Sequence, residues 1–163
     1  MLSTIEKVLF LKTVDLFSRL PGQDLAQIAG IAHEISYRKG DELIREGEVG
    51  DALFLLVAGE VSVHCGPQEI SKLGERQAVG EMAILDNEPR SASVTAVSPV
   101  HCLKVEREDF QELMGEKPEI AHGIILVLTQ RLREADRKIH PEAPLLRISG
   151  TTPGLIGPRS DPR

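Results

Sequence analysis

The sequence predicts a mixed α+β fold that is mainly β: an antiparallel β-roll, built like a double-stranded jelly-roll barrel, with helices on both sides of it. Three observations predict this class. Apolar residues recur at helical spacing before residue 33, alternate with polar residues in short runs over 33–105, and return to helical spacing after Glu106. Glycine and charged residues separate the short runs, as is typical of the tight turns of an antiparallel sandwich or barrel.

Length and composition indicate a single core. A chain of 163 residues fits one compact domain with peripheral helices or a tail better than two full domains. Hydrophobic residues make up 41% and charged residues 27%, which is enough for a globular core without disulfides or metal. Aromatic residues are only 3%, so Leu, Ile and Val must build that core.

Residues 1–32 are expected to form N-terminal helices. Apolar residues keep helical spacing from Ile5 to Leu20, and Pro21-Gly22 then breaks the chain. A second short helix is expected over residues 24–32, because three apolar residues share one of its faces: Leu25, Ile28 and Ile31.

Residues 33–105 are expected to form the roll. Its strands should be short, because Gly-containing turns such as Gly40-Asp41 and Gly59-Glu60 interrupt the alternating pattern every few residues. The expected strands cover residues 33–37, 42–45, 52–57, 60–65, 69–72, 93–96 and 100–105.

Helices are expected again over residues 106–139. Residues 108–114 predict a short helix, and Pro118, a residue suited to a first helical turn, opens a longer one toward Ile139. Gly123 within this helix is either a flexible point or a site of close packing. Residues 140–163 contain five prolines and are expected to form a disordered tail.

A short helical stretch and a turn interrupt the roll at residues 79–92. Gly80 would let the backbone approach a ligand, and the first NH groups of a helical turn starting at Glu81 suit an anionic oxygen. Glu81 can accept hydrogen bonds from hydroxyls, Arg90 offers a fork for phosphate oxygens, and Ser91 adds a hydroxyl. Together they describe a nucleotide site, although Glu81 and Arg90 could also simply pair across a surface turn.

The segment VGEMAILDNEPRSASVTA, residues 79–96, resembles the phosphate-binding cassette of cyclic-nucleotide-binding domains of the catabolite-activator and protein kinase A regulatory-subunit type. Upstream, GDALFLLVAGEVSVH at residues 50–64 resembles the run that forms two central strands of that family's roll. The marked departure is Val79, where the family usually has Phe; this change removes packing volume but no ligand group. No attached DNA-binding domain is recognised.

The resemblance implies a role for each cassette residue. Arg90 would bind the exocyclic phosphate oxygens, Glu81 the ribose 2′-hydroxyl, the backbone of residues 80–83 the remaining acceptors, and Ser91 the phosphate or purine. The implied ligand-binding residues are Gly80, Glu81, Met82, Ala83, Arg90, Ser91 and Ala92.

The resemblance implies that the ligand is cyclic AMP or cyclic GMP. It specifies the residues that would contact the purine base less well than those that would contact the phosphate and ribose. In the bacterial branch of the family, hydroxyl residues on the long C-terminal helix contact adenine, but the corresponding positions here are Ala135 and Asp136. Asp136 could accept from an adenine amine or from guanine donors, and Arg133 could pack on the base. Both could instead be solvated charges on the helix surface.

The leading hypothesis is a non-enzymatic sensor that reports ligand occupancy by moving its C-terminal helices, which act as a lid. One alternative is a ligand-free interaction module with the same fold. Another is a cupin-like metal enzyme, which is disfavoured because the strand histidines, such as His64 and His101, lack the spacing of a ligand set. No metal, cofactor or catalytic group is expected.

Charge and hydropathy limit the partners. The net charge is −6 and Lys and Arg do not cluster, so nucleic-acid binding is not expected. No segment approaches the ~20 apolar residues of a membrane span, so a cytoplasmic protein is expected. The two cysteines, Cys65 and Cys102, are expected to be buried, reduced thiols. An unknown protein effector, and a homodimer through the 118–139 helix, are the partners that this hypothesis allows.

Overall fold

The computed structural model describes residues 1–140, so residues 141–163 of the tail expected over 140–163 lie outside the described residues. The chain divides into one compact unit, Met1–Val127, and a second unit that begins at Leu128. Within the described residues the helices are α1 (Thr4–Leu11), the 3-10 helix η1 (Asp15–Phe17), α2 (Gly22–Ile31), α3 (Glu81–Leu85), α4 (Arg107–Glu116) and α5 (Pro118–Ile139).

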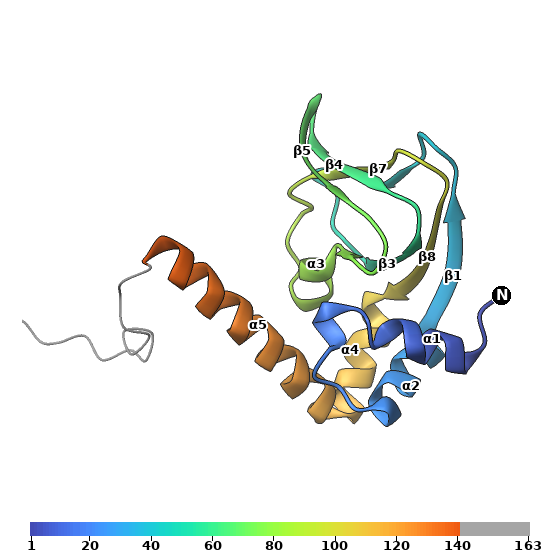
Figure 1. Cartoon of the computed structure of the whole chain (residues 1–163), viewed down its shortest axis with the longest axis vertical. Coiled ribbons are helices and arrows are strands. Elements are labelled where there is room, and N and C mark those ends of the chain that lie inside the picture. Colours follow the sequence, from blue (N-terminus) through green and yellow to red (C-terminus); the bar gives the residue numbers. More distant parts are fainter. Residues whose placement is uncertain (141–163) are drawn as a thin grey trace, which may run out of the picture. The chain divides into compact units, whose positions relative to one another are not determined.

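The strands of the described chain form two four-stranded sheets in which every pairing is antiparallel (Figure 1). One sheet has the order β1-β8-β3-β6 and the other the order β2-β7-β4-β5. The bounds are β1 (Ala32–Tyr37), β2 (Glu42–Ile44), β3 (Ala52–Ala58), β4 (Val61–Cys65), β5 (Gln68–Leu73), β6 (Ala78–Val79), β7 (Ser93–Ala96) and β8 (Val100–Glu106). The predicted mainly β fold class is confirmed, as two packed sheets that form an open roll.

Strand β6 was not predicted. It has two residues and pairs Val79 with Phe54 and Ala78 with Leu55 of β3. A strand this short leaves no alternating pattern in the sequence, because its place depends on a partner more than twenty residues earlier in the chain. Val79 is 4% exposed and belongs to the core, so the smaller side chain in place of Phe still packs there.

The core of the roll lies between the two sheets. It collects inward-facing residues from both, including Phe54, Leu56, Val61 and Val94. The Tyr37 and Phe54 rings meet edge to face, with centroids 6.1 Å apart. Aliphatic residues make up most of this core, as the low aromatic content requires.

The helices beside the roll bury a second group of apolar residues. Phe17 of η1 and Phe110 of α4 are almost fully buried, and their ring centroids lie 6.3 Å apart. The helix predicted over 24–32 begins at Gly22 and ends at Ile31, because Ala32 already pairs with Val105 as the first residue of β1. None of the described helices is both long enough and apolar enough to cross a membrane.

Gly123 of α5 is explained by close packing. A Cβ atom built at this buried glycine would lie 2.4 Å from Leu20 Cδ2. Since that contact is shorter than van der Waals distance, any larger residue would push Leu20 aside. The first turns of α5 therefore approach the segment between η1 and α2 closely, which favours the packing explanation over a flexible point.

The two cysteines differ in their surroundings. Both are free thiols, but Cys102 of β8 is fully buried, whereas Cys65 of β4 is only partly buried, which corrects the expectation for Cys65. Burial raises the pKa of the Cys102 thiol to about 12. The Cys65 thiol donates to the carbonyl of Ser91, with 3.4 Å between Sγ and O.

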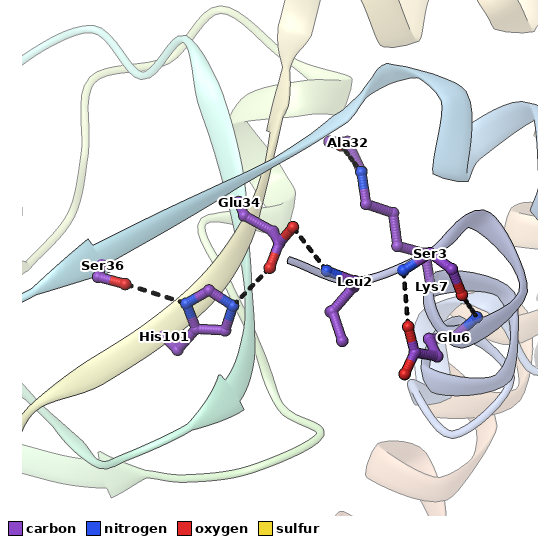
Figure 2. Close-up of polar contacts among 8 residues, drawn as sticks. All are labelled: Leu2, Ser3, Glu6, Lys7, Ala32, Glu34, Ser36 and His101. Atoms are coloured by element: carbon purple, nitrogen blue, oxygen red, sulfur yellow. Dashed lines mark hydrogen bonds and ion pairs between the residues drawn. The ribbon is translucent and has the colours of Figure 1, made fainter.

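The N-terminal segment is fastened to the roll by charged side chains (Figure 2). The Glu34 carboxylate on β1 accepts from the Leu2 N–H at 2.9 Å and contacts His101 Nε2 on β8 at 3.0 Å. Lys7 Nζ donates to the carbonyl of Ala32 at 2.7 Å. Glu34 therefore links the N-terminus to two neighbouring strands.

Replacing Glu34 with glutamine should reduce stability near neutral pH, and the difference from the wild type should shrink in acid. The Leu2 N–H and His101 hold the pKa of Glu34 below its ordinary value of 4.5, because they bond its charged form. A lowered folded-state pKa gives stability that is complete above the ordinary value and is lost as pH falls through the folded-state pKa. Urea unfolding of both proteins between about pH 7 and about pH 3 checks this. A difference that stays constant across that range would contradict it.

Candidate functional site

The predicted interruption of the roll is a single helical turn between β6 and β7. Helix α3 lies between the roll and α4, in contact with β3 and α4 (Figure 1). It begins after Gly80, whose φ of 83° and ψ of 21° are left-handed. That conformation is easily adopted only by glycine, so the chain can turn sharply from the strand into the helix. With five residues, α3 has a small dipole, and the positive charge of the site comes mainly from arginine.

The backbone of Arg90 is fixed by the turn that follows β2. The Arg90 N–H donates to the carbonyl of Glu48 at 2.8 Å, and the Arg90 carbonyl accepts from the Gly47 N–H at 2.9 Å. Val49 and Pro89 form an isolated antiparallel bridge next to these bonds. Arg90 is therefore held against a turn that lies more than forty residues earlier in the sequence.

The Arg90 guanidinium is half-buried over the start of α3. Its Nη2 donates to the carbonyl of Ala52 at 2.6 Å and its Nη1 to the carbonyl of Gly80 at 3.1 Å. A Cβ atom at Gly80 would lie 2.4 Å from Arg90 Nη1. Gly80 is thus required twice, for its left-handed backbone and because a guanidinium passes directly over it.

Electrostatics make this guanidinium suited to an anion. Burial lowers the pKa of Arg90, the Asp51 carboxylate partly opposes that effect, and the positive charge of Arg107 adds to it. A half-buried cation with a second cation nearby is stabilised when an anion approaches. The charge at this position therefore favours an anionic ligand.

The other predicted cassette residues lie before and after Arg90 in the sequence. Glu81 is partly buried at the start of α3, Met82 is 73% exposed, and Ala83 continues the helix backbone. Ser91 is exposed and Ala92 is partly buried in the segment that leads to β7. The structure therefore brings Gly80 and Arg90 into contact, while the assigned roles of the remaining residues stay predictions.

The candidate base contacts lie on α5, in the unit that begins at Leu128. Arg133 is exposed and Asp136 is partly buried there. Their role toward a purine remains a prediction that rests on the family resemblance alone.

Sequence reasoning missed the groups that hold the cassette in place. The carbonyl of Ala52 binds Arg90, and two side chains of α4, Arg107 and Gln111, reach the other end of α3. A backbone carbonyl leaves no signal in a sequence, and Arg107 reads as one more polar residue at a helix start. Among the described residues, no group of three or more His, Cys, Asp or Glu residues could hold a metal ion.

The described residues form an antiparallel β-roll between helices, and a glycine-led helical turn under a half-buried arginine interrupts the roll. The family model described as "Cyclic nucleotide-binding domain" matches residues 34–117, which is more than half of the chain. The chain belongs to the cyclic nucleotide-binding domain family.

Known relatives carry this domain in longer chains. The chain is 38% identical over 108 residues to the cyclic AMP receptor protein of Thermus thermophilus. This match covers 63% of this chain and 50% of that protein. It is 36% identical over 118 residues to human cGMP-dependent protein kinase 2, covering 68% of this chain and 16% of the kinase. This chain therefore spans half or less of either relative.

A solved structure shares the fold over most of its length. The N-terminal domain of a transcriptional regulator from Streptomyces coelicolor A3(2) superimposes with a TM-score of 0.72 at 27% sequence identity. The match covers 80% of this chain and 94% of that domain.

Proposed function

We propose that the protein binds a cyclic nucleotide, cyclic AMP or cyclic GMP, and acts as a non-enzymatic regulatory sensor. The observation that carries the proposal is the half-buried Arg90 guanidinium, held over Gly80 at the start of α3. Membership of the cyclic nucleotide-binding domain family supports it, since the family match includes the whole cassette. One similar protein is named for cyclic AMP and another for cGMP, so both ligands are tested below.

In this proposal Arg90 exchanges backbone carbonyls for phosphate oxygens. Its two present acceptors, the carbonyls of Gly80 and Ala52, are neutral, and an ionised phosphate offers stronger charge-assisted bonds. Glu81 accepts from the ribose 2′-hydroxyl, and the backbone of residues 80–83 together with Ser91 and Ala92 surrounds the remaining ligand atoms. Arg133 and Asp136 are the proposed base contacts, with cyclic AMP and cyclic GMP as the alternatives for Asp136.

Occupancy is reported by the C-terminal helices. Helix α4 touches α3, so a cassette that tightens on a ligand favours one arrangement of α4 and α5 over another. The proposed output is contact with an unknown protein effector in the cytoplasm.

A homodimer through α5 belongs to the same proposal. Three exposed apolar side chains recur every seven residues along this helix: Ile125, Leu132 and Ile139. A seven-residue apolar repeat is the pattern of helices that wind around each other. Light scattering at micromolar concentration should give twice the monomer mass, and a monomer mass would overturn the dimer.

Calorimetric titration with cyclic AMP and cyclic GMP, side by side, tests the function. Heat that saturates at one ligand per chain is expected for at least one of them, and the difference between the two affinities identifies the base. No heat with either ligand would overturn the proposal and favour a ligand-free interaction module of the same fold.

A further inference from the structure

Arg107, the first residue of α4, contacts two separate parts of the cassette region. Its Nη1 donates to the carbonyl of Gly50 at 3.2 Å and to Oδ1 of Asn87, which lies just after α3. Its backbone N–H donates to the carbonyl of Asp51 at 2.7 Å. The start of α4 is therefore bonded both to the segment that enters β3 and to the segment between α3 and Arg90.

A second side chain of α4 repeats this connection one turn later. Gln111 Nε2 lies 3.4 Å from the carbonyl of Ile84, whose side chain is 2% exposed. Because Arg107 and Gln111 are four residues apart, they lie on the same face of α4. Two points of the cassette, Ile84 and Asn87, are thus held by one helix face.

The same short segment of chain holds both arginines. The carbonyl of Gly50 accepts from Arg107, and the carbonyl of Ala52, two residues later, accepts from Arg90. The charge of Arg107 also acts on Arg90 and lowers its pKa. The two guanidinium groups are therefore bonded to carbonyls that lie only two residues apart in the chain.

We propose that Arg107 is a positioning residue that latches the cassette to α4 through Asn87, and that this latch both supports ligand affinity and carries the signal of occupancy into α4. The inference rests on the proposed function, because it concerns the same ligand site. Arg107 acts through Asn87, Gly50 and Arg90, and the proposal needs no contact between Arg107 and the ligand.

The test compares Arg107→Gln, Asn87→Ala and the double variant by calorimetry, using the cyclic nucleotide that the wild type binds. Each single change should raise Kd roughly tenfold, the effect of losing one bond to a charged group. The double variant should be no weaker than Arg107→Gln, because both changes remove the same contact. Arg38→Gln is the matched control, since Arg38 is 93% exposed, and its Kd should equal that of the wild type.

Hydrogen exchange separates a latch from a merely structural residue. In the wild type, ligand should change the exchange of amides in residues 107–116, and in Arg107→Gln this response should be lost even at saturating ligand. Arg107→Lys keeps the charge without the planar fork and should recover part of the affinity but not the response. If Arg107→Gln does not fold, as judged by urea unfolding, Arg107→Lys and Asn87→Ala carry the same comparison.

The outcomes are distinct. A wild type that binds neither nucleotide overturns the proposed function itself. A wild type that binds, together with an Arg107→Gln protein of unchanged Kd and unchanged exchange response, overturns the latch alone. Additive losses in the double variant also overturn it, because they would show that Arg107 and Asn87 act independently.

Discussion

Replacing Arg90 with leucine is expected to abolish measurable binding of cyclic nucleotides. Arg90 is the half-buried cation of the site, with two guanidinium nitrogens already directed at acceptors, the carbonyls of Gly80 and Ala52. Removing one partner of a buried, hydrogen-bonded charge pair costs about 2–5 kcal/mol, which is a loss of roughly 30-fold to several thousand-fold in affinity. Calorimetry at the ligand concentrations that saturate the wild type should therefore record no binding heat.

Two comparisons make this result specific. Arg38→Leu makes the same chemical change at an exposed arginine of the same compact unit and should leave Kd unchanged. Glu81→Ala should also abolish measurable binding, because the proposed acceptor for the ribose hydroxyl is lost. Unchanged affinity in both Arg90→Leu and Glu81→Ala would refute the cassette assignment. Urea unfolding of each variant checks that the protein is folded, since leucine removes the hydrogen bonds that Arg90 donates to two carbonyls.

Replacing Gly59 with alanine is expected to destabilise the whole roll. Gly59 lies in the turn between β3 and β4 with φ of +93°, which an L-residue with a side chain rarely adopts. A Cβ atom there would lie 2.2 Å from the carbonyl oxygen of Pro99 and 2.8 Å from the Cα atom of Val100. Both neighbours are backbone atoms, so the strands themselves must shift. We expect a loss of roughly 2–4 kcal/mol in the free energy of unfolding.

Gly40→Ala is the matched control for this prediction. Gly40 has nearly the same backbone angle, φ of +91°, but nothing lies within 4 Å of the position of its Cβ atom. The control should lose only the conformational part, about 1 kcal/mol. Urea unfolding of the two variants against the wild type measures both values. Equal losses would show that the close approach of Pro99 adds nothing to the requirement for glycine at Gly59.

The sequence by itself predicted the order of the elements apart from β6, and it named the residues of the proposed cassette. The change of apolar period from helical to alternating and back is a local signal, and β7 and α5 have the bounds that it predicts. Gly80 and Arg90 were named from sequence, because close approach of the backbone to a ligand favours glycine and a phosphate ligand favours arginine. Such features depend on neighbouring residues, so they leave a pattern in the chain.

Only the tertiary structure decided which groups hold those residues. Strand β6 exists because Val79 meets Phe54, Arg90 is fixed by the carbonyl of Ala52, and Arg107 reaches Asn87 from the start of α4. Each of these contacts joins residues that are twenty or more positions apart. The Ala52 partner is a backbone carbonyl, a group that every residue carries. The proposed chemistry of the site therefore rests on residue types, whereas its geometry depends on long-range packing that residue types do not encode locally.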